Sequence, residues 1–209
     1  MTESSGVIKV LGLHMSPRLD GSSAKMLNVF ADGVEKAGAK FKALSVSQLD
    51  VRGCMECGHC SEKGECAIDF DDMNQIYSAW EEAQSDGKEG VSTKIVIATP
   101  VFFYDMPSQG KAVLDRSQAF WTRRYVLGKN ADGVPGSKGF LLACGATKGK
   151  DLFMPVTLAV KYLFDAIGFP KSFPTLSYRG IERPEKFSPD QLAEIQKAGY
   201  DFVRPPQEA

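Results

Sequence analysis

Several features that would restrict the partners of this chain are absent from its sequence. No apolar run approaches the length of a bilayer span, because the best one, IVIATPVFFYDM, is interrupted by Pro100 and Asp105. Charge of one sign is nowhere concentrated, since 25 basic and 26 acidic residues give a net charge of −1. We therefore expect a soluble protein, with neither a membrane nor a nucleic acid as its main partner.

We do not expect the N-terminal segment to be a secretory leader. The N-terminal segment MTESSGVIKV has neither the basic start nor the apolar core of a signal peptide, which favours a reducing, cytoplasmic compartment. Internal repeats and low-complexity segments are absent as well. The chain has 209 residues, of which 43% are hydrophobic, so we expect residues 1–209 to bury a sizeable core as one domain.

Cysteine is scarce, but four of the five lie within the stretch CMECGHCSEKGEC, at Cys54, Cys57, Cys60 and Cys66. Thiolates at this density predict a shared metal centre, and the C-x2-C-x2-C opening repeats the start of the bacterial ferredoxin run that holds [4Fe–4S] clusters. The longer spacer before the fourth cysteine would let one loop, residues 47–70, close around a single cluster. Gly58 and Gly64 can supply the backbone conformations that such a loop needs.

Two alternatives to a cluster remain open. Structural zinc usually uses two cysteine pairs a dozen or more residues apart, whereas here the second pair would follow almost at once. Disulfides need an oxidising compartment, and five cysteines are an odd number. Cys144, at the end of the apolar run GFLLACGA, is expected to be a small buried hydrophobe.

Strand-like and helical segments alternate along the chain. Strands are predicted over residues 7–13, 41–46, 94–100, 137–145 and 171–178, and helices over 22–38, 71–84, 107–121, 151–168 and 188–203. This alternation predicts an α/β fold, a doubly wound five-stranded parallel sheet with helices on both faces. Asp71 or Asp72 is the expected N-cap of the second helix. Two long loops, 47–70 and 123–136, are expected to be functional or mobile.

Ligands of doubly wound sheets bind beyond the carboxyl ends of the strands. The loop after the first strand, residues 14–23, is rich in hydroxyls, contains Arg18 and opens onto a helix, which predicts a cradle for one terminal phosphate. It is neither a G-x-G-x-x-G nor a Walker loop, and His14 is expected to be structural. The aromatic residues in 99–108 either wall a flat ligand or form a buried cluster without one.

Three segments together are more specific than any of these features alone. SPRLDGSSAKML, GCMECGHCSEKGECAIDFDDM and TPVFFYDMPSQGKAVLDR, in this order, resemble the flavodoxin-fold NADPH-dependent FMN reductase superfamily, and within it the iron–sulfur flavoproteins of anaerobic prokaryotes. The similarity covers roughly residues 6–150. It implies a flavodoxin-like fold that carries FMN and, in the cysteine loop, a [4Fe–4S] cluster.

The resemblance also implies which residues bind the flavin. The FMN phosphate would be held by Ser16, Arg18, Gly21, Ser22 and Ser23. The isoalloxazine ring would meet Pro100, Val101, Phe102 and Phe103 on one loop and Cys144, Gly145 and Ala146 on another. Two positions depart from the family pattern. Met15 stands where a small residue is usual, which affects the tightness of the turn, and Asp20 is expected to point outward or to cap the helix.

The function that follows is electron transfer. We expect single electrons to pass from a ferredoxin-like donor through the [4Fe–4S] cluster to FMN and on to a small-molecule acceptor, and the resemblance suggests a homodimer or homotetramer. Two alternatives are an NAD(P)H-dependent FMN or quinone reductase with structural cysteines, and a non-enzymatic redox sensor or carrier. Arg52, Lys63 and Lys94 are expected to be solvated surface charges.

Overall fold

The computed structural model describes residues 8–129 and 132–204. Val7 of the first predicted strand, the N-terminal residues before it and positions 130–131 of the second long loop lie outside these ranges. The strands are β1 (Lys9–His14), β2 (Lys40–Ser45), β3 (Thr93–Pro100), β4 (Lys138–Gly145) and β5 (Thr175–Arg179). The helices are α1 (Ser22–Lys36), α2 (His59–Lys63), α3 (Met73–Lys88), α4 (Ser108–Arg116), α5 (Gln118–Tyr125), α6 (Met154–Ala166) and α7 (Pro189–Phe202), with 3-10 turns η1 (Val46–Gln48) and η2 (Pro184–Lys186).

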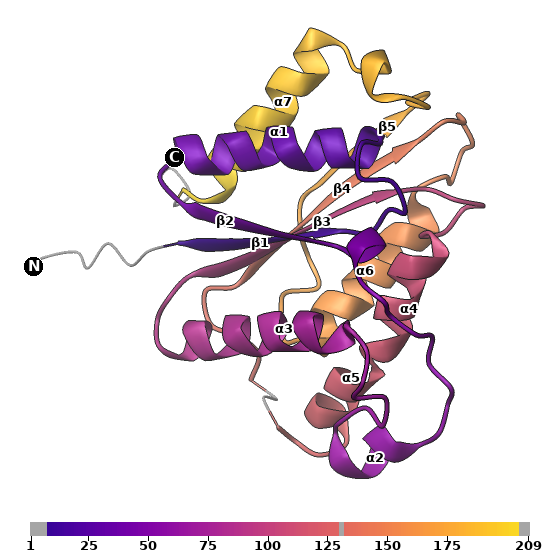
Figure 1. The fold of residues 1–209 in the computed structure, drawn as a ribbon. Helices are drawn as coiled ribbons and strands as arrows, with labels where there is room; N and C mark the ends of the chain where they lie inside the picture. The colour runs from indigo at the N-terminus through magenta and orange to yellow at the C-terminus, as the bar shows by residue number, and fades with distance from the viewer. Residues whose placement is uncertain (1–7, 130–131, 205–209) are drawn as a thin grey trace, which may run out of the picture.

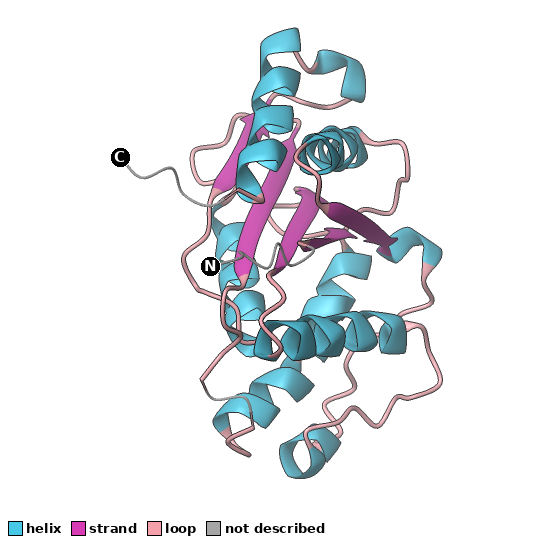
Figure 2. Ribbon diagram, turned by 90° about the vertical axis from the view of Figure 1, so that its left-hand side faces the viewer, coloured by secondary structure: helices cyan, strands magenta, loops and turns pink. Residues whose placement is uncertain are grey.

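The five strands form one parallel sheet in the order β2-β1-β3-β4-β5. This is the flavodoxin-like order, so the predicted fold class is confirmed. Helices α1 and α7 cover one face of the sheet, and α3 to α6 cover the other (Figure 1). Viewed from the side, the strands twist between these two helical layers (Figure 2).

The central strand β3 explains why its sequence is a continuous apolar run. Ile95, Val96 and Ile97 are completely buried, because both faces of the strand are covered by helices. The edge strand β2 instead has only exposed and half-buried positions. None of the helices within the described ranges combines the length and apolar character that crossing a bilayer requires.

Two glycines let α1 and α7 cross at close range. A Cβ atom placed on Gly33 would lie 2.0 Å from the carbonyl oxygen of Gln196, and one placed on Gly199 would lie 2.0 Å from that of Phe30. No side chain fits at these distances. The two glycines therefore set the separation of the helices that cover this face of the sheet.

Two expectations from the sequence are wrong. The helix predicted over 107–121 is two helices, α4 and α5, which meet at Ser117, whose hydroxyl donates to the Leu114 carbonyl (2.6 Å) and competes with the helical hydrogen bonds there. Lys94 is buried rather than solvated. It lies at the start of β3, and its Nζ donates to the Phe202 carbonyl at the C-terminal end of α7 (2.9 Å).

Candidate functional site

A hollow of about 120 Å³ lies beyond the carboxyl ends of β1, β3 and β4, and we call it the strand-end hollow. Eleven of the twelve predicted cofactor-binding residues line it: Ser16, Arg18, Gly21, Ser22, Ser23, Pro100, Val101, Phe102, Cys144, Gly145 and Ala146. Two further lining residues, Ile181 and Glu182, follow β5. They could have been found by applying the strand-end rule to the fifth strand as well.

The first turn of α1 forms one wall of the strand-end hollow. Gly21 is the N-cap residue and offers no side-chain oxygen, so no side chain caps the helix. The Ser22 hydroxyl is buried and has no hydrogen-bond partner among residues 8–129 and 132–204. The Ser16 hydroxyl accepts a hydrogen bond from the Arg18 backbone N–H (3.2 Å), which shapes the turn. Free N–H groups, an unpaired hydroxyl and a guanidinium together make an anion site.

His14 orients Ser23 from beneath the turn. Its Nε2 lies 3.0 Å from the Ser23 hydroxyl oxygen, and its Nδ1 lies 3.1 Å from that of Ser45. Burial lowers the pKa of His14 to about 4, so the ring is neutral near pH 7. A neutral imidazole can donate to one serine and accept from the other, which is the structural role expected for this residue.

The two departures from the family pattern are both accommodated. Met15 is completely buried and extends the pairing of β1, because its N–H donates to the Ala98 carbonyl (2.8 Å). A Cβ atom at Gly110 of α4 would lie 2.9 Å from the Cβ of Met15, so a glycine there leaves room for the methionine. Asp20 is exposed, and it does not cap α1.

The aromatic loop after β3 folds into a tight turn. Phe102 and Asp105 exchange two backbone hydrogen bonds, of 2.8 and 2.9 Å, while Phe103 and Tyr104 between them have φ of 51° and 65°. Bulky residues rarely adopt this left-handed conformation, and such strain concentrates at functional sites. Phe103 is fully exposed at the tip and does not line the hollow, so its contact with a flavin stays a prediction.

Cys144 and its neighbours close the strand-end hollow from β4. The Cys144 carbonyl accepts the Val101 N–H (2.8 Å), and the Gly145 carbonyl accepts the Ile181 N–H (3.0 Å). Burial raises the pKa of the Cys144 thiol to about 12, so the thiol stays protonated and unreactive. The expectation of a small buried hydrophobe is confirmed, and the side chain also lines the hollow.

A second hollow, of about 640 Å³, is lined by all four clustered cysteines, and we call it the cysteine hollow. The loop that contributes them runs out beyond α4 and α5, where α2 lies beside α5 (Figure 1). Burial, together with the neighbouring Cys54 and Cys66 thiols, raises the pKa of the Cys60 thiol. The Cys54 and Cys66 thiols therefore both lie close enough to Cys60 to influence it electrostatically.

The backbone of the cysteine loop bends sharply at several points. Gly58 and Gly64 flank α2 with φ of 76° and 71°, as their positions in the motif suggested. Glu56 also has a positive φ, of 54°, and its N–H donates to the Cys54 sulfur (3.4 Å). Within residues 8–129 and 132–204, no three His, Cys, Asp or Glu side chains are arranged to hold a metal ion.

A buried ion pair that the sequence did not reveal lies between the cysteine loop and α4. The Arg116 guanidinium is 2.6 Å from the Asp71 carboxylate, and both side chains are almost completely buried. Burial alone would raise the pKa of Asp71, but its hydrogen bonds with Arg116 and with the Arg52 and Met73 N–H groups outweigh that effect and lower it. Asp72, not Asp71, is the N-cap residue of α3.

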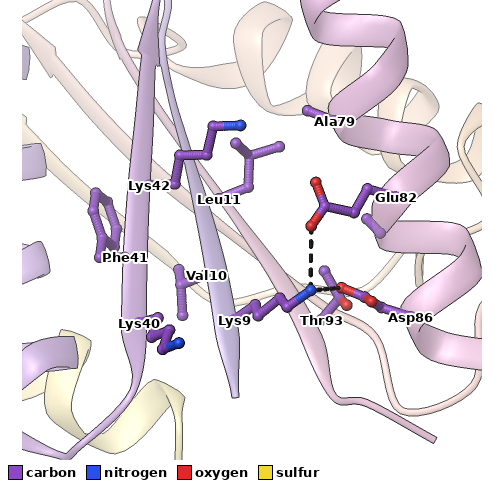
Figure 3. A pocket seen from close by; sticks show the side chains of 11 residues that line it. Lys9, Val10, Leu11, Lys40, Phe41, Lys42, Ala79, Glu82, Asp86 and Thr93 are labelled. Carbon is purple, nitrogen blue, oxygen red and sulfur yellow. Dashed lines mark hydrogen bonds and ion pairs between the residues drawn. The ribbon is translucent and has the colours of Figure 1, made fainter. Parts of the chain in front are cut away.

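A third hollow, of about 270 Å³, lies at the opposite end of the sheet, where β1 and β2 begin and α3 passes over them (Figure 3). Lys9 reaches across it to Glu82 (3.2 Å) and Asp86 (2.8 Å). None of the predicted site residues lies there. The chemistry that the sequence indicates is thus concentrated in the other two hollows.

Comparisons of the sequence with known proteins agree on a family of flavin-dependent proteins. The family described as NADPH-dependent FMN reductase matches residues 8–149. Iron–sulfur flavoproteins from Methanocaldococcus jannaschii and Methanosarcina thermophila are 30% and 31% identical to the chain over 143 and 132 residues, which is 68% and 63% of this chain. The match spans 63% of the length of each of these relatives, and 51% of an iron–sulfur flavoprotein from Archaeoglobus fulgidus that is 29% identical.

Solved structures share the fold at low sequence identity. An NAD(P)H:quinone oxidoreductase from Methanothermobacter marburgensis superposes with a TM-score of 0.63 at 16% identity, covering 94% of this chain and 99% of the other. An FMN-dependent NADH-azoreductase from Bacillus anthracis, solved in complex with FMN, gives a TM-score of 0.59 at 12% identity and covers 94% and 100% of the two chains.

Proposed function

Because the chain belongs to the NADPH-dependent FMN reductase family, we propose that it is an FMN-dependent oxidoreductase that passes electrons to a small-molecule acceptor. The observation that carries this proposal is the buried, unpartnered Ser22 hydroxyl at the uncapped start of α1, in the wall of the strand-end hollow. A buried hydroxyl without a partner costs about 1–3 kcal/mol, and a phosphate oxygen would satisfy it.

In this proposal the FMN phosphate lies against the first turn of α1. The N–H groups there and the Ser22 and Ser23 hydroxyls donate to it, and the Arg18 guanidinium supplies the balancing charge. A Cβ atom at Gly21 would lie 3.6 Å from the Arg18 Nε, so the side chain of Arg18 already extends along this turn. Ser16 acts indirectly, by holding the Arg18 backbone in place.

The flavin ring would lie between two loops. Pro100, Val101 and Phe102 come from the end of β3, and Cys144, Gly145 and Ala146 from the end of β4. When bound, FMN supplies both one-electron and two-electron chemistry. The protein side chains here orient the ring and exclude water from one side of it, while the exposed Phe102, Phe103 and Tyr104 turn leaves the other side accessible to a reaction partner.

We further propose that Cys54, Cys57, Cys60 and Cys66 hold a [4Fe–4S] cluster in the cysteine hollow. Four thiols around one hollow are the donor set that iron–sulfur clusters require, and relatives about 30% identical are named iron–sulfur flavoproteins. The physiological donor in this reading is a ferredoxin-like one-electron carrier, and the assembly is a homodimer or homotetramer.

One measurement set tests both cofactor assignments. The purified protein, kept anaerobic, should contain iron and acid-labile sulfide in equal amounts near four per chain, and one FMN, with visible absorption from both. A chain that binds FMN but retains only zinc, or no metal, would contradict the cluster and leave the flavin assignment standing. A chain with no affinity for FMN would contradict the proposed function itself.

A second candidate is an NAD(P)H-dependent FMN or quinone reductase whose cysteines are structural. The description of the matching family, which names NADPH, favours it. Rapid anaerobic mixing separates the two candidates. Fast flavin reduction by NADPH without any iron–sulfur protein supports the reductase, whereas fast reduction only by reduced ferredoxin supports the electron-transfer function. A reversible spectral change without turnover would indicate a redox sensor or carrier.

A further inference from the structure

The Arg116–Asp71 pair joins the two ends of the cysteine loop. One Arg116 Nη1–H donates to the Arg52 carbonyl (3.1 Å), two residues before the first clustered cysteine. An Nη2–H donates to the Ile68 carbonyl (2.8 Å), two residues after the last one. Asp71 completes the arrangement by accepting the Arg52 N–H (2.9 Å). A single side chain of α4 thus holds both entry and exit of the loop.

Arg116 also has one donor to spare. Its Nε–H is buried and has no hydrogen-bond partner among the described residues, although the other guanidinium nitrogens are bonded. Arg116 lines the cysteine hollow. Cys66 is one of the groups whose charge raises the pKa of Arg116, so the two side chains lie within electrostatic range of each other. A buried donor left free on a residue that lines a hollow with four thiols can serve an acceptor bound there.

The charged residues of the cysteine hollow also single out Arg116. Among its described lining residues, Arg116 is the only one with a cationic side chain, and Glu56 and Asp115 are the carboxylates. Tyr77 is packed behind the guanidinium, with its hydroxyl donating to the Arg116 carbonyl (2.8 Å). A group held by four thiolates is anionic, and Arg116, although paired with Asp71, is the cationic residue in the described lining of this hollow.

We propose that Arg116, locked by Asp71, is a positioning residue for the cluster: it preorganises the cysteine loop and donates its free Nε–H to a thiolate sulfur or sulfide in the cysteine hollow. The inference rests on the proposed cluster function. Hydrogen bonds and positive charge next to a cluster stabilise its reduced form, so Arg116 should also raise the reduction potential.

Two variants distinguish a role of Arg116 in positioning the cysteine loop and cluster from a role in the stability of the whole protein. The double variant Asp71→Leu/Arg116→Met removes both charges and leaves no buried ion unpaired, so its fold should survive. The variant Arg116→Lys keeps the charge and loses the planar fork. Lys197→Gln, which removes an exposed ion pair from α7 and touches no residue of the cysteine hollow, is the control.

The first readout needs no cluster. Amide hydrogen exchange of residues 53–67 in the metal-free protein should be faster in the double variant than in the parent, while exchange in β3 and β4 is unchanged. The second readout uses protein reconstituted with ferrous iron and sulfide. Iron loss to a chelator should be about 10- to 100-fold faster in the double variant, and its cluster potential should be lower. Arg116→Lys should lose iron faster but keep a potential nearer the parent value.

The outcomes are distinguishable. Equal exchange rates in the loop of parent and double variant would overturn the preorganising role. Equal iron loss and equal potential would overturn the role toward the cluster. If the parent itself retains no iron after reconstitution while loop exchange still differs, the cluster proposal fails and the loop-ordering role of Arg116 stands.

Discussion

Ser22 and Arg116 share a property that links them to function. Within the described part of the chain, each has one buried polar atom without a hydrogen-bond partner, and each lines a different candidate hollow. An unpaired buried donor costs about 1–3 kcal/mol, so it persists most readily where a ligand completes it. At the scale of single residues, the free donors of these two side chains therefore mark the places where we expect cofactor atoms.

Arg18 provides the most direct test of the strand-end hollow. Arg18→Ala should weaken FMN binding by about 10- to 100-fold, because a charge-assisted hydrogen bond contributes about 1.5–3 kcal/mol. Fluorescence titration of the apoprotein measures the dissociation constant, with Lys25→Ala on the exposed side of α1 as the control. Riboflavin, which lacks the phosphate, should bind parent and variant almost equally. The same FMN affinity in both would contradict the phosphate assignment.

Lys94 should make stability depend on alkaline pH. Burial lowers its pKa to about 8 from 10.5, so between these values the unfolded chain binds more protons than the folded one, and stability rises with pH. Lys94→Met should flatten this rise. Urea unfolding across that pH window checks it, with the exposed Lys186→Met as control. An unchanged slope in Lys94→Met would show that Lys94 is not the titrating group.

At the scale of elements, the crossing of α1 and α7 depends on glycine. Gly199→Ala should lower the free energy of unfolding by about 1–3 kcal/mol, since the added methyl meets the backbone of Phe30 and the helices must separate. Denaturant unfolding measures the loss. Gly53→Ala is the control, because a Cβ atom there meets nothing within 4 Å. A neutral Gly199→Ala would mean that the crossing is looser than described.

The sequence predicted the elements best where burial is simplest. β3 and β4 were placed to within one residue at each end, because strands covered on both faces are continuous apolar runs. The break between α4 and α5 was missed, since it depends on one hydroxyl at Ser117. The Arg116–Asp71 pair joins residues 45 positions apart, and no local pattern reveals such a contact.

The residues of the candidate site also fall into those that the sequence predicts and those that it does not. Loop residues at strand ends follow from topology, so eleven of the predicted residues meet in one hollow. The position of Phe103 could not be predicted from the sequence. A turn with two residues of positive φ is usually marked by glycine, but here Phe103 and Tyr104 adopt it. The burial of Lys94 could not be predicted either. Its apolar stem is buried, and its ammonium group is satisfied by a carbonyl at the end of α7, a contact distant in sequence.

At the scale of the whole molecule, α4 connects the two hollows. It begins just after the Phe102–Asp105 turn and ends at Arg116, so at about 1.5 Å per residue its nine residues span roughly 13 Å. One end of α4 thus lies close in sequence to Phe102 of the strand-end hollow, and the other end contributes Asp115 and Arg116 to the cysteine hollow. If electrons pass between the proposed cluster and the flavin, the rigid helix α4 would help to fix the position of the cysteine hollow relative to the loop after β3.

Cys60→Ala tests the coupling of the two centres. Loss of this ligand should remove or destabilise the cluster, while FMN, bound by other loops, should still bind and still be reduced by dithionite. Reduction by reduced ferredoxin should fail, because the group that accepts single electrons is gone. Anaerobic stopped-flow mixing measures the rate. An unchanged rate in cluster-free Cys60→Ala would favour the reductase alternative.

The base of the cysteine loop bears on how well the fold tolerates changes in that loop. Asp50 and Asp72 face each other there: the Asp72 N–H donates to the Asp50 carbonyl, and the Asp50 N–H donates to the Asp72 carboxylate, both at 2.9 Å. The loop thus begins after η1 and ends at the start of α3 with its two ends hydrogen-bonded to each other. Because its two ends are joined at the base, the loop between them can change in length without displacing the strands, as surface insertions commonly do.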